Sequence, residues 1–238
     1  MLDHGSAALD VGANIGYMTS LLAARVGEKG RVDAFEPHPA VFGELHENVA
    51  SWQTCRRIGR ICTHKLALSD KTGFAKLLTS AHFEKNRGTT SIGAGIGGAN
   101  ELQAPTQRLE NLLEPGQKVD IMKLDVEGHE INVLRGAGTM LKSGAIRDIV
   151  FEEWRPYPTE VTQLLEDAGY SLFGLDMTPL GIEVTPTTIR PGQFSHNAPS
   201  YLATRAPERA LGRLSGRGWA TLGSPLPWRR RLKASPHT

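Results

Sequence analysis

The chain has 238 residues, of which 39% are hydrophobic and 22% charged, and this composition is ordinary for a globular protein with a sizeable core. No stretch has the apolar length of a transmembrane helix, no secretory signal opens the chain, and the two cysteines, Cys55 and Cys62, give no disulfide framework. These features exclude membrane-spanning and disulfide-stapled classes, and we expect a cytoplasmic protein.

The net charge of +2 is unevenly distributed along the chain. The segment from Arg205 onward holds eight basic residues and one acid, whereas residues 1–204 hold 19 basic residues and 24 acids. The acidic part therefore offers no basic face for a specific nucleic-acid partner. We expect one domain over residues 1–204 and a basic, disordered tail over 205–238, because glycine and proline in the tail disfavour a packed helix.

The first predicted strand runs into Asp10 and is followed by a tight loop between Gly12 and Gly16 that contains Asn14. Glycines let the backbone turn sharply and approach a ligand, and the next helix presents free N–H groups to it. The spacing D-x-G-x-x-x-G differs from the G-x-G-x-x-G of dinucleotide-binding proteins and favours S-adenosylmethionine over NAD. These four residues are predicted to bind the cofactor; a strand-to-helix turn without a ligand is the alternative.

The strand begins almost at residue 1, so the helix or lid that usually precedes it is missing. We expect either a truncated start or a cofactor site that is more open than usual. The second predicted strand, residues 31–36, ends in Glu36, whose carboxylate can accept hydrogen bonds from both hydroxyls of an adenosine ribose. A solvated glutamate at a strand end is the alternative.

An amphipathic helix is predicted over residues 39–51 and a third strand over 61–68, which ends in Ser69 and Asp70. Asp70 either binds the exocyclic amine of adenine or starts the turn that follows. An extra strand is predicted over residues 73–80. The glycine-rich stretch 86–99 is expected to be a mobile lid or a disordered loop.

A further apolar strand ends in Asp125 and Glu127, with Lys123 before them and His129 at the start of the next helix. Acids are favoured at a helix start by the helix dipole, yet here they can also face a substrate. The next strand, 146–151, ends in Glu152 and Glu153. Asp125 and one of these acids could hold a divalent cation, but no metal is predicted, because no third ligand suggests itself.

The remaining predicted elements are a helix with its apolar stripe at residues 161–168 and two strands at 172–175 and 200–204. Three segments of the chain together resemble the FkbM-type family of S-adenosylmethionine-dependent methyltransferases. They are residues 9–16, residues 35–37 with Leu45 and Asn48 downstream, and residues 123–130 leading to 134–137.

The resemblance covers roughly residues 7–204. It implies an α/β fold, with a Rossmann-like seven-stranded methyltransferase sheet of order 3-2-1-4-5-7-6, the last strand antiparallel, and helices on both faces. It also implies methyl transfer from S-adenosylmethionine, most often to a hydroxyl oxygen of a sugar, polyketide or other small molecule.

Within this hypothesis the glycine loop holds the methionyl part of the cofactor, Glu36 the ribose and Asp70 the adenine. Asp125, Glu127 and His129 are the catalytic candidates. Glu127 and His129 rank ahead as the base, because Asp125 is expected beside the sulfonium. Glu153 is an additional candidate.

Three other functions compete with this one. An NAD(P)-dependent oxidoreductase is disfavoured by the absent G-x-G-x-x-G and hydride-transfer pair. A nucleic-acid methyltransferase is disfavoured because neither an Asn/Asp-Pro-Pro-aromatic loop nor a catalytic Pro-Cys occurs. A cofactor-binding protein that has lost turnover is permitted by the short N-terminal segment. The oligomeric state is not predicted.

Overall fold

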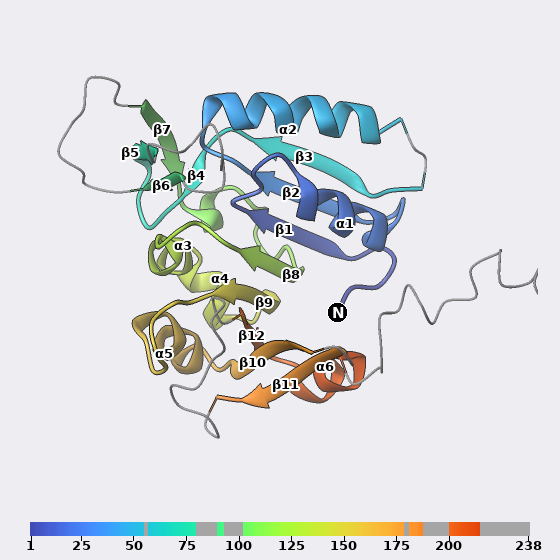
Figure 1. Ribbon diagram of the computed structural model, residues 1–238, viewed down its shortest axis with the longest axis vertical. Coiled ribbons are helices and arrows are strands. Elements are labelled where there is room, and N and C mark those ends of the chain that lie inside the picture. Colours follow the sequence, from blue (N-terminus) through green and yellow to red (C-terminus); the bar gives the residue numbers. More distant parts are fainter. Residues whose placement is uncertain (55–56, 80–89, 93–101, 179–180, 188–199, 215–238) are drawn as a thin grey trace, which may run out of the picture.

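The computed structural model describes residues 1–54, 57–79, 90–92, 102–178, 181–187 and 200–214. An eight-stranded sheet of order β11-β10-β12-β9-β8-β1-β2-β3 forms its centre (Figure 1). Its strands are β1 (Ala7–Val11), β2 (Arg31–Phe35), β3 (Arg60–His64), β8 (Val119–Leu124), β9 (Ile146–Glu152), β10 (Ser171–Thr178), β11 (Gly181–Pro186) and β12 (Ser200–Thr204).

The parallel half of this sheet agrees with the predicted order. β3, β2, β1, β8 and β9 are parallel neighbours, and they correspond to the expected 3-2-1-4-5. β12 lies antiparallel between β9 and β10, as the 5-7-6 ending requires. The prediction of seven strands is wrong by one, because β11 pairs antiparallel with β10 and extends the sheet edge.

Helices cover both faces of the sheet, and each face has its own apolar core. The helices are α1 (Tyr17–Val26), α2 (Pro39–Trp52), α3 (Glu130–Gly136), α4 (Gly138–Lys142), α5 (Glu160–Asp167) and α6 (Pro207–Leu214), with a 3-10 helix at Leu109–Asn111. Side chains of α1 and α2 pack with the inner strands in one core, and those of α3, α4 and α5 pack in the other. Among the described helices, none is long and apolar enough to cross a membrane.

A second, four-stranded sheet accounts for the region after β3 (Figure 1). Its strands are β4 (Ala67–Leu68), β5 (Gly73–Thr79), β6 (Thr90–Ile92) and β7 (Leu102–Gln107). The predicted strand over residues 61–68 is thus two strands in different sheets, whereas the extra strand after Gly73 is confirmed as β5. Most of the glycine-rich stretch 86–99 lies outside the described residues.

The predicted tail boundary at residue 205 is wrong, because residues 207–214 form α6 against the sheet. Ala210 is buried beside Phe173 and Leu202. Arg209 and Arg213, one helical turn apart, both donate hydrogen bonds to Asp3, at 2.8 and 2.6 Å. Burial and these ion pairs outweigh the cost of Gly212 within the helix. Residues 215–238 lie outside the described part of the chain.

Candidate active site

The carboxyl ends of β1, β2, β8 and β9 meet at one edge of the sheet, and most of the predicted site residues follow these ends. Ligands of open parallel α/β sheets bind at this edge. The register aligns Val11 with Leu124 and Leu124 with Phe151, so the residues that follow these strands begin at one level.

The glycine loop after β1 is fixed to both neighbouring strands. The N–H groups of Gly12 and Ala13 donate to the carbonyl oxygen of Phe35 at 3.1 and 2.9 Å. Gly12 has φ of 76°, and a Cβ there would lie 1.9 Å from the carbonyl oxygen of Asp125. The close approach of Asp125, the residue after β8, therefore requires glycine at position 12 whether or not a ligand binds.

Asn14 and Glu36 join the loop to the end of β2. Asn14 has φ of 51°, and its backbone N–H donates to Glu36 Oε2 at 3.0 Å. The other carboxylate oxygen, Oε1, accepts from the backbone N–H of His38 at 2.8 Å. Glu36 is buried, and this burial raises its pKa although the two N–H donors favour the ionised form. The sequence prediction brought these two residues to one site, and the structure places them in contact.

Asp10 and Gly16, at the two ends of the loop, connect it to the neighbouring helices. Asp10 has no exposed surface, and its Oδ2 accepts from Thr19 Oγ1 of α1 at 2.5 Å. Desolvation raises the pKa of Asp10. A Cβ at Gly16 would come within 2.7 Å of Leu45, so α1 and α2 pack closely there. Protein encloses the carboxylate of Asp10, so the structure gives it a contact with α1 and no surface for direct contact with a cofactor.

Asp70 and His129 are connected through Ser69, at the point where β4 meets the start of α3. Ser69 Oγ donates to Asp70 Oδ1 at 3.1 Å and lies 3.0 Å from His129 Nε2. Since Ser69 uses its proton toward Asp70, we assign the Nε2–H tautomer to His129, which leaves Nδ1 as the basic nitrogen. Burial lowers the pKa of His129, so the imidazole is neutral at pH 7.

Asp70 also carries a structural role. Burial alone would raise the pKa of Asp70, but hydrogen bonds from Asn132 and Ser69 outweigh it, and the pKa is lowered. The carbonyl oxygen of Asp70 accepts from Arg108 Nη1 at 2.7 Å. These contacts agree with the turn that the sequence offered as the alternative to adenine binding.

Asp125, Glu127 and Glu152 form the acidic side of the site. Partial desolvation and the carboxylates of Asp125, Glu130 and Glu152 raise the pKa of Glu127. The residue as a whole is exposed and has φ of 51°. A left-handed glutamate is strained, and such strain concentrates at functional sites. Glu152, which the sequence analysis names as a strand-end acid but not as a base candidate, also has a raised pKa, owing to burial and to Asp125.

Glu153, the additional base candidate, is held elsewhere. It is buried, and its two carboxylate oxygens accept from Arg155 Nε at 3.0 Å and Nη2 at 2.9 Å. Its pKa is lowered because these hydrogen bonds outweigh the effect of burial. Glu152 and not Glu153 therefore faces the other acids. The register of β8 and β9, which no local pattern reveals, decides between the two neighbours.

Lys123 is a site residue that the sequence prediction mentioned but did not select. Its Nζ donates to the carbonyl oxygen of Gly12 at 2.7 Å and lies 3.3 Å from Asp125 Oδ2 and 3.5 Å from Asp10 Oδ1. The signal in the sequence was a lysine between apolar strand residues, two positions before an acid on the same strand face.

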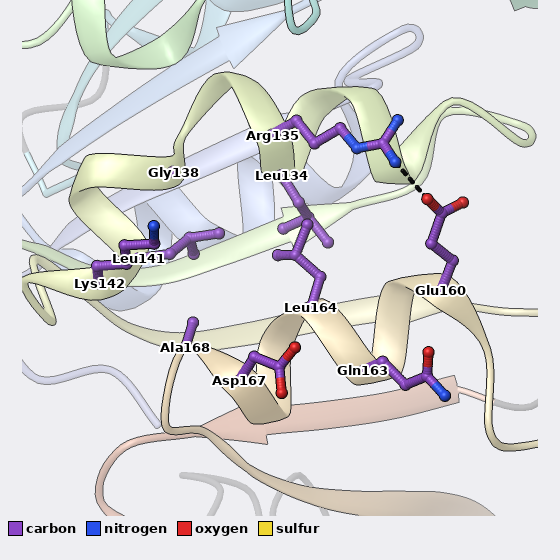
Figure 2. Close-up of a pocket in the computed structure, with 10 residues that line it drawn as sticks. All are labelled: Leu134, Arg135, Gly138, Leu141, Lys142, Glu160, Gln163, Leu164, Asp167 and Ala168. Atoms are coloured by element: carbon purple, nitrogen blue, oxygen red, sulfur yellow. Dashed lines mark hydrogen bonds and ion pairs between the residues drawn. The ribbon is translucent and has the colours of Figure 1, made fainter.

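No group of three or more potential metal ligands is found among the described residues. A groove of about 520 Å³ lies between α3–α4 and α5 (Figure 2). Leu134, Leu141 and Leu164 line it, and the ion pair between Arg135 and Glu160 crosses it. None of the predicted site residues lines this groove, so it is separate from the candidate active site.

Known proteins support one family for this arrangement. The family model described as the methyltransferase FkbM domain matches residues 10–172. The methyltransferase sdnD of Sordaria araneosa is 28% identical over 69% of this chain and 73% of its own length. The hexuronic acid methyltransferase AglP of Haloferax volcanii is 30% identical over 68% of this chain and 62% of its own length.

A solved structure agrees at the level of the fold. The methyltransferase FkbM of Methylobacillus flagellatus KT matches with a TM-score of 0.53 and 14% identity, over 85% of this chain and 44% of that one. The chain thus spans less than two thirds of AglP and less than half of the solved protein. It belongs to the FkbM family of methyltransferases, enzymes of class EC 2.1.1 that use S-adenosylmethionine.

Proposed function

We propose that this protein methylates a hydroxyl group of a sugar or another small molecule. The observation that carries the proposal is the glycine loop, which is bonded to Glu36 on one side and faces Asp125 on the other. The relative named as a hexuronic acid methyltransferase supports a sugar as the acceptor.

The residues present fit S-adenosylmethionine. Gly16 supplies no side-chain cap to α1, so the amides of the first turn are available to the carboxylate of the methionyl group. Each Glu36 oxygen accepts one backbone N–H, and each has a second lone pair for a ribose hydroxyl. Gly12, Asn14 and Gly16 shape the loop, and Asp10 connects it to α1 through Thr19. Asp70 stays a candidate for the adenine amine.

The chemistry needs alignment and one proton acceptor. When bound, S-adenosylmethionine supplies a methyl group activated by its positively charged sulfur. Alignment of acceptor and methyl group by the protein is worth about 7–11 kcal/mol, and a placed base adds about 10²–10⁴-fold. His129 is neutral and offers Nδ1, whereas the raised pKa of Glu127 makes its carboxylate a stronger base than an ordinary glutamate. Asp125, whose backbone lies against Gly12, is assigned to the sulfonium.

The test is methyl transfer from labelled S-adenosylmethionine to a library of hydroxyl compounds that includes neutral sugars, amino sugars and uronic acids. We expect label in at least one acceptor, and a loss of about 10²-fold or more in His129→Gln or Glu127→Gln, whichever removes the base. Donor binding without transfer to any member would instead indicate a binding protein without turnover.

A further inference from the structure

Lys123 joins three parts of the site that are far apart in the sequence. Its side chain is 15% exposed and comes from β8, whereas its partners Asp10 and Gly12 lie on β1 and the glycine loop. The ammonium group has three N–H donors, and three acceptors surround it within 3.5 Å. One donor is hydrogen-bonded to the Gly12 carbonyl, and the two carboxylates are ion-pair partners of the ammonium.

The ammonium of Lys123 also balances the charge of Asp10, the buried carboxylate next to the loop. Asp10 is fully buried, and the positive charge of Lys123 offsets the desolvation that raises its pKa. Asp10 in turn accepts a hydrogen bond from Thr19, so β1, α1 and β8 are connected through one cation. A buried carboxylate without its cation is strongly destabilising.

We propose that Lys123 is a positioning residue of the methyl-donor site, which fixes the Gly12 carbonyl and the Asp125 carboxylate in one arrangement. This inference rests on the proposed use of S-adenosylmethionine at the glycine loop. The loop and the acid are then coupled, because the same ammonium donates a hydrogen bond to the Gly12 carbonyl and forms an ion pair with Asp125.

A second consequence concerns donor and product. S-adenosylmethionine carries a positive sulfonium, whereas S-adenosylhomocysteine has a neutral sulfur. The charge of Lys123 offsets part of the attraction of Asp10 and Asp125 for the sulfonium. Lys123 therefore limits the preference of the site for the donor over the product.

The experiment compares Lys123→Met with Lys118→Met, an exposed lysine just before β8. Calorimetry measures the Kd of each variant for S-adenosylhomocysteine and S-adenosylmethionine, and hydrogen exchange follows residues 11–18 in the ligand-free protein. For Lys123→Met we expect a Kd for S-adenosylhomocysteine raised about tenfold or more. We also expect faster exchange in the loop, and a Kd ratio of donor to product lowered severalfold. Lys118→Met keeps the values of the unmodified protein.

A double variant, Lys123→Met with Asp10→Asn, removes the buried charge together with its cation and guards against a folding defect. We expect it to keep the weakened affinity for both ligands, because no ammonium holds the Gly12 carbonyl. The Kd ratio of donor to product should return toward that of the unmodified protein. Equal Kd values for Lys123→Met and the unmodified protein would overturn the positioning role. An equal rise in Kd for both ligands would leave Lys123 only a structural role. It would overturn the proposed effect of its charge on the preference for donor over product. Failure of the unmodified protein to bind either ligand would remove the proposed function, and this inference with it.

Discussion

At the scale of single residues, Glu36 has two tasks that a single carboxylate can perform at once. It holds the backbone of Asn14 and His38, and in the proposed function its remaining lone pairs accept the ribose hydroxyls. A glutamate at the end of β2 thus shapes the loop before any ligand arrives. The sequence predicted the second task, whereas the first depends on backbone directions that appear only in the folded chain.

We predict that Glu36→Ala weakens binding of S-adenosylhomocysteine by roughly 1.5–3 kcal/mol, because charge-assisted hydrogen bonds to the ribose are lost. Calorimetry measures the change, and Glu47→Ala, an exposed glutamate of α2, serves as the matched control. An unchanged affinity in Glu36→Ala would show that the ribose lies elsewhere.

His129 makes the stability of the fold depend on pH. Its folded pKa is lowered by burial, with only Asp70 acting in the opposite direction, whereas an unfolded histidine has a pKa of about 6.5. Between these two values the unfolded chain binds more protons than the folded chain. The free energy of unfolding therefore falls as the pH is lowered from about 6.5 toward the folded pKa, and His129 contributes no further loss below it.

We predict that His129→Gln loses less stability than the unmodified protein between pH about 7 and about 5. Urea unfolding at several pH values measures the difference, and His46→Gln, an exposed histidine of α2, is the control. Parallel pH profiles for the unmodified protein and His129→Gln would contradict the lowered pKa.

At the scale of elements, the sequence predicted those helices and strands that are determined by residues close together in the chain. The strand–loop–helix at Asp10–Gly16 and the helix after Pro39 follow from glycine spacing and apolar periodicity. α6 was missed because the partners of its arginines include Asp3, more than 200 residues away, which no window of sequence contains. The break between β3 and β4 was missed because no glycine, proline, asparagine or aspartate marks it between residues 61 and 68, and only the pairing separates the two strands.

We predict that Ala210→Asp destabilises the fold by about 3–5 kcal/mol, because it places an unpaired carboxylate between Phe173 and Leu202. Leu211→Asp, one residue along on the exposed side of α6, is expected to change stability by only about 0.5 kcal/mol. Denaturant unfolding compares the two. Similar small effects at both positions would mean that α6 does not pack on the sheet in solution.

At the scale of the whole molecule, the order of the parallel strands followed from the family resemblance, and the family match confirms that resemblance. The eighth strand was not predictable from the family pattern, because β11 adds to an edge that the pattern leaves open. Of the candidate site, the loop and the acids after β2 and β8 were predicted from strand ends. Lys123 and Glu152 required the register between strands.

We predict that S-adenosylhomocysteine at about 100 times its Kd stabilises the domain by ~2.7 kcal/mol, because it binds only the folded state. For a chain of this size the melting temperature should rise by roughly 5–10 °C. Differential scanning fluorimetry with NADH as the comparison ligand checks this. Stabilisation by NADH in place of S-adenosylhomocysteine would contradict the cofactor assignment.

The hydrogen bonds from α6 to the first residues have a consequence for the order of folding. Arg209 reaches the carbonyl oxygen of Met1 across 208 positions, and Arg213 reaches Asp3 across 210. At a synthesis rate of about 5–20 residues per second, on the order of 10–40 s separates the emergence of these partners from the ribosome. β1 can pair with β2 early, but the residues just before β1 have no partner in α6 until Arg209 and Arg213 have been made. The contacts between α6 and residues 1–3 are therefore among the last of the described contacts of the domain to form.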